Sequence, residues 1–110
     1  MQFLMLVCRD NEPVEAPAGP GGDVEEWVDT MDARGVRVAG DRLAHEREAS
    51  VVRVRGGRVL VTDGPFLETK EALAGFDLLD CRDLAEAIEV AAAHPAAATA
   101  VMEIRPIWVD

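Results

Sequence analysis

Residues 51–62 read VVRVRGGRVLVT, in which two runs of strand-forming residues are separated by Gly56-Gly57. Glycine supplies the positive φ angles that a two-residue hairpin turn requires. The stretch therefore predicts a β-hairpin, with one strand over Val51 to Arg55 and the other over Arg58 to Thr62. Antiparallel pairing here favours an antiparallel sheet as the framework of the chain.

Two segments with helical periodicity flank this hairpin. Each begins with an aspartate three residues before a glutamate, which is the pattern of a capping box: Asp23 with Glu26, and Asp83 with Glu86. Apolar residues then recur at helical spacing, namely Val24, Trp27, Val28 and Met31 in the first segment and Leu84, Ala87, Ile88 and Ala91 in the second. Gly35 is the expected end of the first helix, and His94-Pro95 that of the second.

Four further segments have strand character: residues 2–8, 36–39, 74–81 and 100–108. The first is apolar on both faces. Residues 11–22 are rich in proline and glycine and residues 40–49 are polar, so both are expected to be irregular. The order strand, helix, strand, hairpin, strand, helix, strand predicts an α+β fold of ferredoxin-like type, an antiparallel sheet with both helices on one face.

Length and composition limit the possible classes of protein. The 110 residues fit a single domain, residues 1–110, and a hydrophobic fraction of 49% is enough for a core. A formal net charge of −10 opposes binding to phosphate backbones and anionic membrane surfaces, so neither nucleic acid nor membrane is an expected partner. The first ten residues lack signal-peptide features, and Cys8 and Cys81 lack a CxxC spacing. We therefore expect a cytoplasmic protein with two reduced, buried thiols.

Helices on one face of the sheet would leave the other face uncovered. Because the first strand is apolar on both sides, a second copy packed sheet against sheet is the natural cover, and a homodimer is expected. Strand alternation assigns to this open face Arg53, Thr62, Asp77, Glu103 and Arg105, with Leu60, Leu79 and Val101. It assigns to the helix face Val52, Val54, Val59, Val61, Phe76, Leu78, Met102 and Ile104.

The charged residues of the open face have two possible roles. Roofed by a partner subunit, they would line a small-molecule cleft. Alternatively, they form cross-strand ion pairs at the rim of the dimer interface.

Residues 63–71 read DGPFLETKE. Gly64 permits an unusual backbone angle and Pro65 fixes the next one, which would hold Asp63 rigidly at a strand end. Such an aspartate suits catalysis, and it equally suits a purely structural turn. The stretch resembles the signature loop of the DGPF-domain proteins within the YCII-related family, where DGPF is followed by a variable residue and ETKE. The resemblance covers most of residues 36–108, including the segments VRVRGGRVLVT, LAGFDLLD, HPAA and EIRPIW.

This resemblance implies a ferredoxin-like fold assembled into a dimeric α+β barrel. It implies two classes of function: enzymes with an Asp-His pair in a cleft, alongside related barrels that include monooxygenases and dehydrochlorinases, or regulators that accompany extracytoplasmic-function sigma factors. Fold alone does not choose between them. His45 lies where the resemblance fades, so no catalytic histidine is assigned to it.

The candidate catalytic residues are Asp63 and His94, and the candidate substrate-binding residues are Arg53, Lys70, Asp77, Glu103 and Arg105. His94 precedes a proline at a helix end, so its alternative role is that of a helix stop. The sequence contains no HExxH, clustered Cys and His, GxGxxG or P-loop motif, and we therefore expect no metal ion and no cofactor.

Two functions follow from these observations. In the first, the protein binds or converts a small molecule in a cleft between the sheet and its dimer partner, with Asp63 as acid or base and Arg105 or Lys70 holding an anionic group. In the second, it is a regulatory module whose acidic surface binds a protein such as a sigma factor. We favour the first, because the charged residues fall on the face that the helices leave open.

Overall fold

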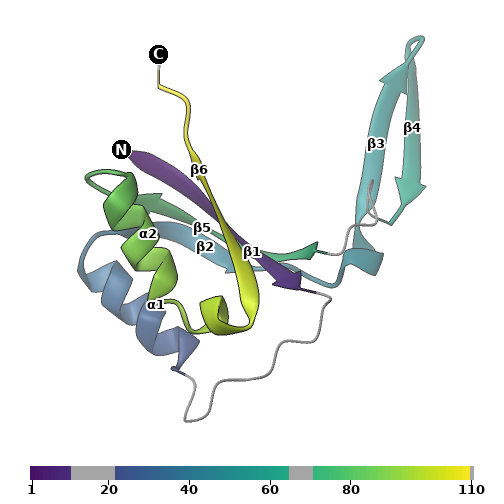
Figure 1. The fold of residues 1–110 in the computed structure, drawn as a ribbon. Helices are drawn as coiled ribbons and strands as arrows, with labels where there is room; N and C mark the ends of the chain where they lie inside the picture. Colours follow the sequence, from purple (N-terminus) through teal and green to yellow (C-terminus); the bar gives the residue numbers. More distant parts are fainter. Residues whose placement is uncertain (11–21, 65–70, 110) are drawn as a thin grey trace.

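The computed structural model describes residues 1–10, 22–64 and 71–109, which form an α+β fold (Figure 1). The main sheet has the spatial order β2-β5-β1-β6, with every neighbouring pair antiparallel. Its strands are β1 (Gln2–Asp10), β2 (Arg37–Arg42), β5 (Glu71–Asp80) and β6 (Ala100–Pro106). Helices α1 (Val24–Ala33) and α2 (Leu84–Ala92) cover the same face of this sheet. The predicted ferredoxin-like fold is therefore confirmed.

The predicted hairpin is confirmed as β3 (Ser50–Arg55) and β4 (Arg58–Asp63), with positive φ angles at both turn glycines. It does not join the main sheet but forms a two-stranded sheet of its own (Figure 1). Because β5 already pairs with β2 on one edge and with β1 on the other, no strand edge is left beside it for the hairpin. The prediction that four hairpin residues face the helices is wrong, since all are exposed: Val52, Val54, Val59 and Val61.

Two short 3₁₀ helices complete the described elements. The first, η1 (Glu46–Glu48), lies in the stretch that was expected to be irregular, and the second, η2 (Pro95–Ala98), follows α2. Neither α-helix among the described residues combines the length and hydropathy that a membrane-crossing helix needs.

Aspartates cap the N-termini of both α-helices, as predicted. The Asp23 carboxylate accepts a hydrogen bond of 2.8 Å from the backbone N–H of Glu25, and that of Asp83 accepts one of 2.9 Å from Glu86. The Glu86 carboxylate in turn accepts a hydrogen bond of 3.0 Å from the backbone N–H of Arg82. These contacts satisfy amides that the helix itself leaves without partners.

Helix α1 ends at Gly35, also as predicted. The N–H of Gly35 donates to the carbonyl of Asp32 and the N–H of Val36 donates to the carbonyl of Met31, each at 3.0 Å. This pair of bonds is a Schellman motif, which needs a positive φ at its central residue, and Gly35 has a φ of 69°.

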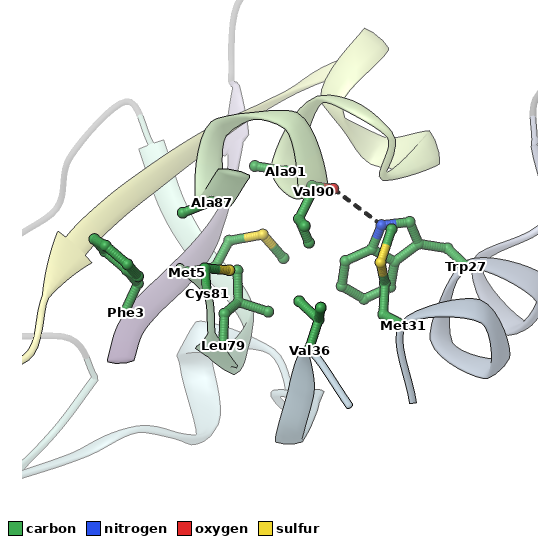
Figure 2. Packing of buried hydrophobic residues seen from close by; sticks show 10 residues of the cluster. All are labelled: Phe3, Met5, Trp27, Met31, Val36, Leu79, Cys81, Ala87, Val90 and Ala91. Carbon is green, nitrogen blue, oxygen red and sulfur yellow. Dashed lines mark hydrogen bonds between the residues drawn. The ribbon is translucent and has the colours of Figure 1, made fainter. Parts of the chain in front are cut away.

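The core lies between the two α-helices and the sheet (Figure 2). The indole N–H of Trp27 donates a hydrogen bond of 3.1 Å to the carbonyl of Val90, which ties α1 to α2. Helix α2 buries Ala87, Val90 and Ala91, whereas Leu84 and Ile88 of the predicted apolar stripe are exposed. Small side chains let α2 lie close to the sheet, so the helix turns its alanine and valine face inward. The whole buried cluster is Phe3, Met5, Trp27, Met31, Val36, Leu79, Cys81, Ala87, Val90 and Ala91.

Strand β5 has the opposite orientation to the predicted one. Leu79 lies opposite Phe3 and Asp77 lies opposite Met5, and all of these are buried on the helix face. Phe76 and Leu78, predicted to face the helices, therefore lie on the open face. The prediction failed because apolar residues occur on both faces of this strand, so the charge of Asp77 favoured the open side.

Candidate functional site

A cavity of about 610 Å³ lies between α1, η2 and the β2–β5 edge of the sheet. This is within the usual range for small-molecule pockets. Apolar side chains from several elements line it: Val7, Val24, Trp27, Val28 and Ala96. Six titratable residues also line it: Glu25, Arg37, Asp41, Arg42, Asp77 and His94. Asp77 and His94 are each only 7% exposed, so both side chains are largely shielded from solvent.

Arg37 and Asp77 form a largely buried ion pair that lines this cavity. The Nε of Arg37 donates a hydrogen bond of 2.8 Å to Oδ1 of Asp77. The other guanidinium nitrogens donate to Oδ1 of Asp32 at 3.2 Å and to the carbonyl of Gly40 at 2.8 Å. With all three nitrogens engaged, Arg37 is fixed in place and holds one carboxylate oxygen of Asp77.

A β-bulge in β2 brings these groups together. Arg37 lies opposite Leu79 and Gly40 lies opposite Asp77, and the register shifts between Arg37 and Ala39. Regular alternation would place residues 37 and 40 on opposite faces of the sheet, but the extra residue puts both on the helix side. The bulge is therefore what lets Arg37 and the bare backbone of Gly40 approach the same carboxylate.

His94 reaches the cavity from the opposite side. It caps η2, and its Nδ1 accepts a hydrogen bond of 3.0 Å from the backbone N–H of Ala96. Its ring lies 4.6 Å from that of Trp27, centroid to centroid. Because a nitrogen that accepts a hydrogen bond carries no proton, the neutral ring carries its proton at Nε2.

The pKa values of the two groups shift in opposite directions. Burial raises the pKa of the Asp77 carboxyl, although its hydrogen bond from Arg37 offsets part of that effect. Burial lowers the pKa of His94, and the negative charge of Asp77 offsets part of that shift. The carboxylate thus becomes a stronger base and the imidazole stays neutral near pH 7.

Asp77 and His94 each have one side-chain polar atom that makes no hydrogen bond within the described residues and is available to a ligand. Within the part of the chain that the structure describes, no hydrogen bond is made by Oδ2 of Asp77 or by Nε2 of His94. No buried side-chain nitrogen or oxygen of the described residues lacks a partner. Both atoms are therefore accessible, and a bound molecule can reach a proton acceptor and a proton donor in one cavity.

Comparison with known proteins defines the family. The model of the YCII-related domain matches residues 1–109. The chain belongs to the YCII-related family. An uncharacterised protein of Rhizobium meliloti (strain 1021) is 43% identical over 70 residues, which are 60% of this chain and 55% of that protein. The alignment thus spans about half the length of this relative.

The predicted site residues of this YCII-related protein lie in different parts of the structure. Asp77 and His94 line one cavity, although Asp77 was expected on the open face. Glu103 and Arg105 do lie on the open face, opposite Leu6 and Leu4 of β1, and both are exposed. Asp77 therefore lies on the opposite face of the sheet from Glu103 and Arg105.

The remaining predicted site residues lie elsewhere. Arg53 is on the hairpin, and Asp63 is exposed at the end of β4, where Gly64 has a φ of 87°. The N–H of Gly64 donates a hydrogen bond of 2.8 Å to the carbonyl of Ala49, which continues the β3–β4 ladder just beyond Asp63. Lys70, with residues 65–69 of the signature loop, lies outside the described residues.

Arg37 is the site residue that sequence analysis missed. It lies within the predicted strand 36–39, where regular alternation would put its side chain on the face opposite that of the buried Val36. A signal was present, because a glycine three residues later is common where a strand contains a bulge. No group of three His, Cys, Asp or Glu side chains among the described residues is arranged to hold a metal ion.

The state of His94 can be measured by NMR. We expect its pKa to lie below 6.5 and its neutral form to carry the proton at Nε2, and Asp77→Asn should lower the pKa further, because it removes a neighbouring negative charge. Since the folded chain disfavours the charged ring, His94 should make the free energy of unfolding decrease as pH falls from about 6.5 through the folded pKa. A pKa above 6.5, or a proton on Nδ1, would contradict this description.

Proposed function

We propose that this YCII-related protein is a small-molecule enzyme that moves a proton at a carbon atom next to a carbonyl group. The observation that carries this proposal is that Oδ2 of Asp77 and Nε2 of His94 are accessible in the same largely apolar cavity. A carboxylate with a raised pKa is suited to removing such a proton, and a neutral imidazole is suited to donating a hydrogen bond to the carbonyl oxygen.

The proposed step balances without a cofactor. Oδ2 of Asp77 accepts the proton from carbon, and the electron pair of the broken C–H bond moves onto the carbonyl oxygen. The N–H at Nε2 of His94 stabilises the enolate that forms, and return of the proton to carbon regenerates the carboxylate. Arg37 acts as a positioning residue, because it holds Oδ1 of Asp77 at 2.8 Å and leaves Oδ2 directed to the ligand.

Deuterium exchange into a panel of simple carbonyl compounds tests this proposal. Small ketones, aldehydes and keto acids with apolar bodies are incubated in D₂O with the protein, and deuterium at the carbon next to the carbonyl is measured by NMR. Asp77→Asn should lower the exchange rate by about 10²- to 10⁴-fold while leaving the fold intact. Exposed Asp41→Asn, at the mouth of the same cavity, is the matched control. Equal exchange by Asp77→Asn and the wild type would refute the role of Asp77.

We also propose that the protein is a homodimer of the DGPF type, joined through the open face of the main sheet. The DGPFLETKE motif at 63–71 supports the subgroup. Half-buried apolar side chains on the face opposite the helices support the interface: Leu4, Leu6, Phe76, Leu78 and Val101. Leu78→Ser should then weaken dimerisation, which sedimentation velocity measures directly.

A regulatory role is the second candidate. Helix α1 carries exposed carboxylates at Glu25, Glu26, Asp29 and Asp32 and no basic residue, which suits a basic protein surface such as that of a sigma factor. A complex that forms with a purified sigma factor and weakens with salt would support this role. Absence of such a complex, together with exchange activity that depends on Asp77, would support the enzyme instead.

A further inference from the structure

We infer that Arg42 selects the ligand of the cavity between α1, η2 and the β2–β5 edge, and that this ligand is a short keto acid, a small carbonyl compound that also carries a carboxylate. The inference rests on the proposed function, because it names the class of substrate on which Asp77 and His94 act. The guanidinium of Arg42 holds the carboxylate at the exposed rim of the cavity, and the carbonyl group lies next to Asp77 and His94.

The register of the sheet places Arg42 on the same face as the Asp77 carboxylate. Gly40 lies opposite Asp77 and Arg42 lies opposite Gly75, so Arg42 is one row of side chains further along the sheet. Residues two apart on a strand point to the same face and are separated by about 7 Å. Gly75 adds no side chain to the row of Arg42, which leaves room beside Asp77. The cavity therefore extends from Asp77 to Arg42, both of which line it.

The guanidinium of Arg42 is available to a ligand. In the part of the chain that the structure describes, its side chain makes no ion pair and no hydrogen bond. The neighbouring Asp41 accepts a hydrogen bond of 2.8 Å from the backbone N–H of Arg42 and makes no ion pair with its side chain. Arg37, which also lines the cavity, already uses all three of its guanidinium nitrogens within the chain. Arg42 thus offers donors that Arg37 does not.

The charges around the cavity favour a ligand with one carboxylate. Arg37 and Asp77 compensate each other, so the positive charge of Arg42 remains for a ligand, with Glu25 as a negative charge on the same cavity. A single guanidinium can bind a carboxylate through two parallel N–H···O bonds. A phosphate group carries about two negative charges near pH 7, for which one arginine in the presence of Glu25 is a poor match.

An anchor at Arg42 would also orient the reacting carbon. Binding energy from a part of the substrate that does not react can hold the reacting atoms in place. Trp27 and Val28 supply apolar walls for the body of the ligand, while Arg42 fixes its charged end. With that end fixed one row of side chains away, the carbon next to the carbonyl is directed to Oδ2 of Asp77.

Ligand titrations followed by NMR test this inference. The probes are pyruvate and levulinate, whose carboxylate is respectively adjacent to the ketone and two carbons away, and their methyl esters, which keep the ketone but lose the charge. The ring signals of His94 report binding, because His94 lines the cavity. We expect the wild type to bind at least one keto acid about tenfold more tightly than its ester.

Three variants assign this preference to a residue. Arg42→Gln should weaken binding of the acid by about tenfold and change binding of the ester little. Glu25→Gln should act in the opposite direction and strengthen binding of the acid by about two- to fivefold. Arg58→Gln makes the same change of charge at the exposed end of the hairpin (Figure 1), and as the matched control it should stay within about twofold of the wild type. Unchanged thermal unfolding would show that each variant is folded.

Three results would overturn the inference. The first is a wild type that binds acids and esters equally, or that binds neither acid at concentrations up to about 10 mM. The second is an Arg42→Gln variant that keeps the preference of the wild type for the acid. The third is tighter binding of dihydroxyacetone phosphate than of either keto acid, which would assign the cavity to a phosphate.

Deuterium exchange separates this inference from the proposed enzyme. Binding of a keto acid that depends on Arg42, without exchange at carbon, would retain the ligand class and refute the proton chemistry. Exchange into neutral ketones that depends on Asp77 and not on Arg42, with no preference for acids, would retain the chemistry and refute the ligand class.

Discussion

Replacement of Arg37 by methionine is expected to lower the free energy of unfolding by about 3–5 kcal/mol near pH 7, because it leaves the buried carboxylate of Asp77 without its partner. The side chains of the pair are only 15% and 9% exposed, so water replaces the lost contact poorly. Chemical denaturation followed by Trp27 fluorescence measures the loss. The same substitution at Arg34, which is 47% exposed and 3.9 Å from Glu86, should cost less than about 1 kcal/mol and serves as the matched control.

The pH dependence of the Arg37→Met variant provides a second check. The folded chain already raises the pKa of Asp77, and removal of Arg37 takes away the contacts that lower it. The folded variant then binds a proton in a pH range where the unfolded chain does not, so its stability should fall as pH rises above about 4. A stability loss that is equal at about pH 4 and pH 7 would mean that the unpaired charge is not its cause. Arg37→Met/Asp77→Leu should restore most of the stability, since a well-packed apolar pair often equals a buried ion pair.

Replacement of Gly40 by alanine is expected to have a comparable effect, above about 3 kcal/mol, through a different cause. A Cβ atom at this position would lie 2.6 Å from the carbonyl oxygen of Phe76 and 2.8 Å from Cγ of Asp77, with Oδ1 of Asp77 closer still. The carboxylate would have to move away from Arg37. Ala39→Ser, at the exposed neighbouring residue, is the control and should be close to neutral.

A double-mutant cycle identifies the source of the Gly40 effect. If the new methyl group acts by displacing the carboxylate, Gly40→Ala should destabilise an Asp77→Ala background less than it destabilises the wild type. Exchange activity should fall along with stability in the single variant, because Oδ2 of Asp77 would no longer be held in place. Equal effects of Gly40→Ala in both backgrounds would assign the loss to strand pairing alone.

Features that depend on neighbouring residues were predictable from the sequence. The two aspartate caps, the Gly35 stop and the Gly56-Gly57 turn are all confirmed, since each rests on a local requirement of backbone geometry. The order of helices and strands was sufficient to predict the ferredoxin-like fold.

Features that depend on distant pairing were not predictable. The face to which Asp77 points is set by the register of β5 against β1 and β2, and an isolated strand with two apolar faces does not reveal it. The face to which Arg37 points was not predictable either, because the bulge in β2 adds one residue and interrupts the regular alternation of side chains. His94 was a candidate catalytic residue with a helix stop as its alternative role, but its proximity to Asp77 comes only from the packing of η2 against the sheet.

The position of the hairpin also affects how this chain can change during evolution. Its first and last residues, Ser50 and Asp63, lie directly opposite each other, so the two ends of the insertion are separated only by a normal interstrand distance. An insertion with adjoining ends can lengthen, shorten or disappear without stretching the framework that holds Arg37, Asp77 and His94. The hairpin can therefore vary while the arrangement of the cavity side chains stays constant.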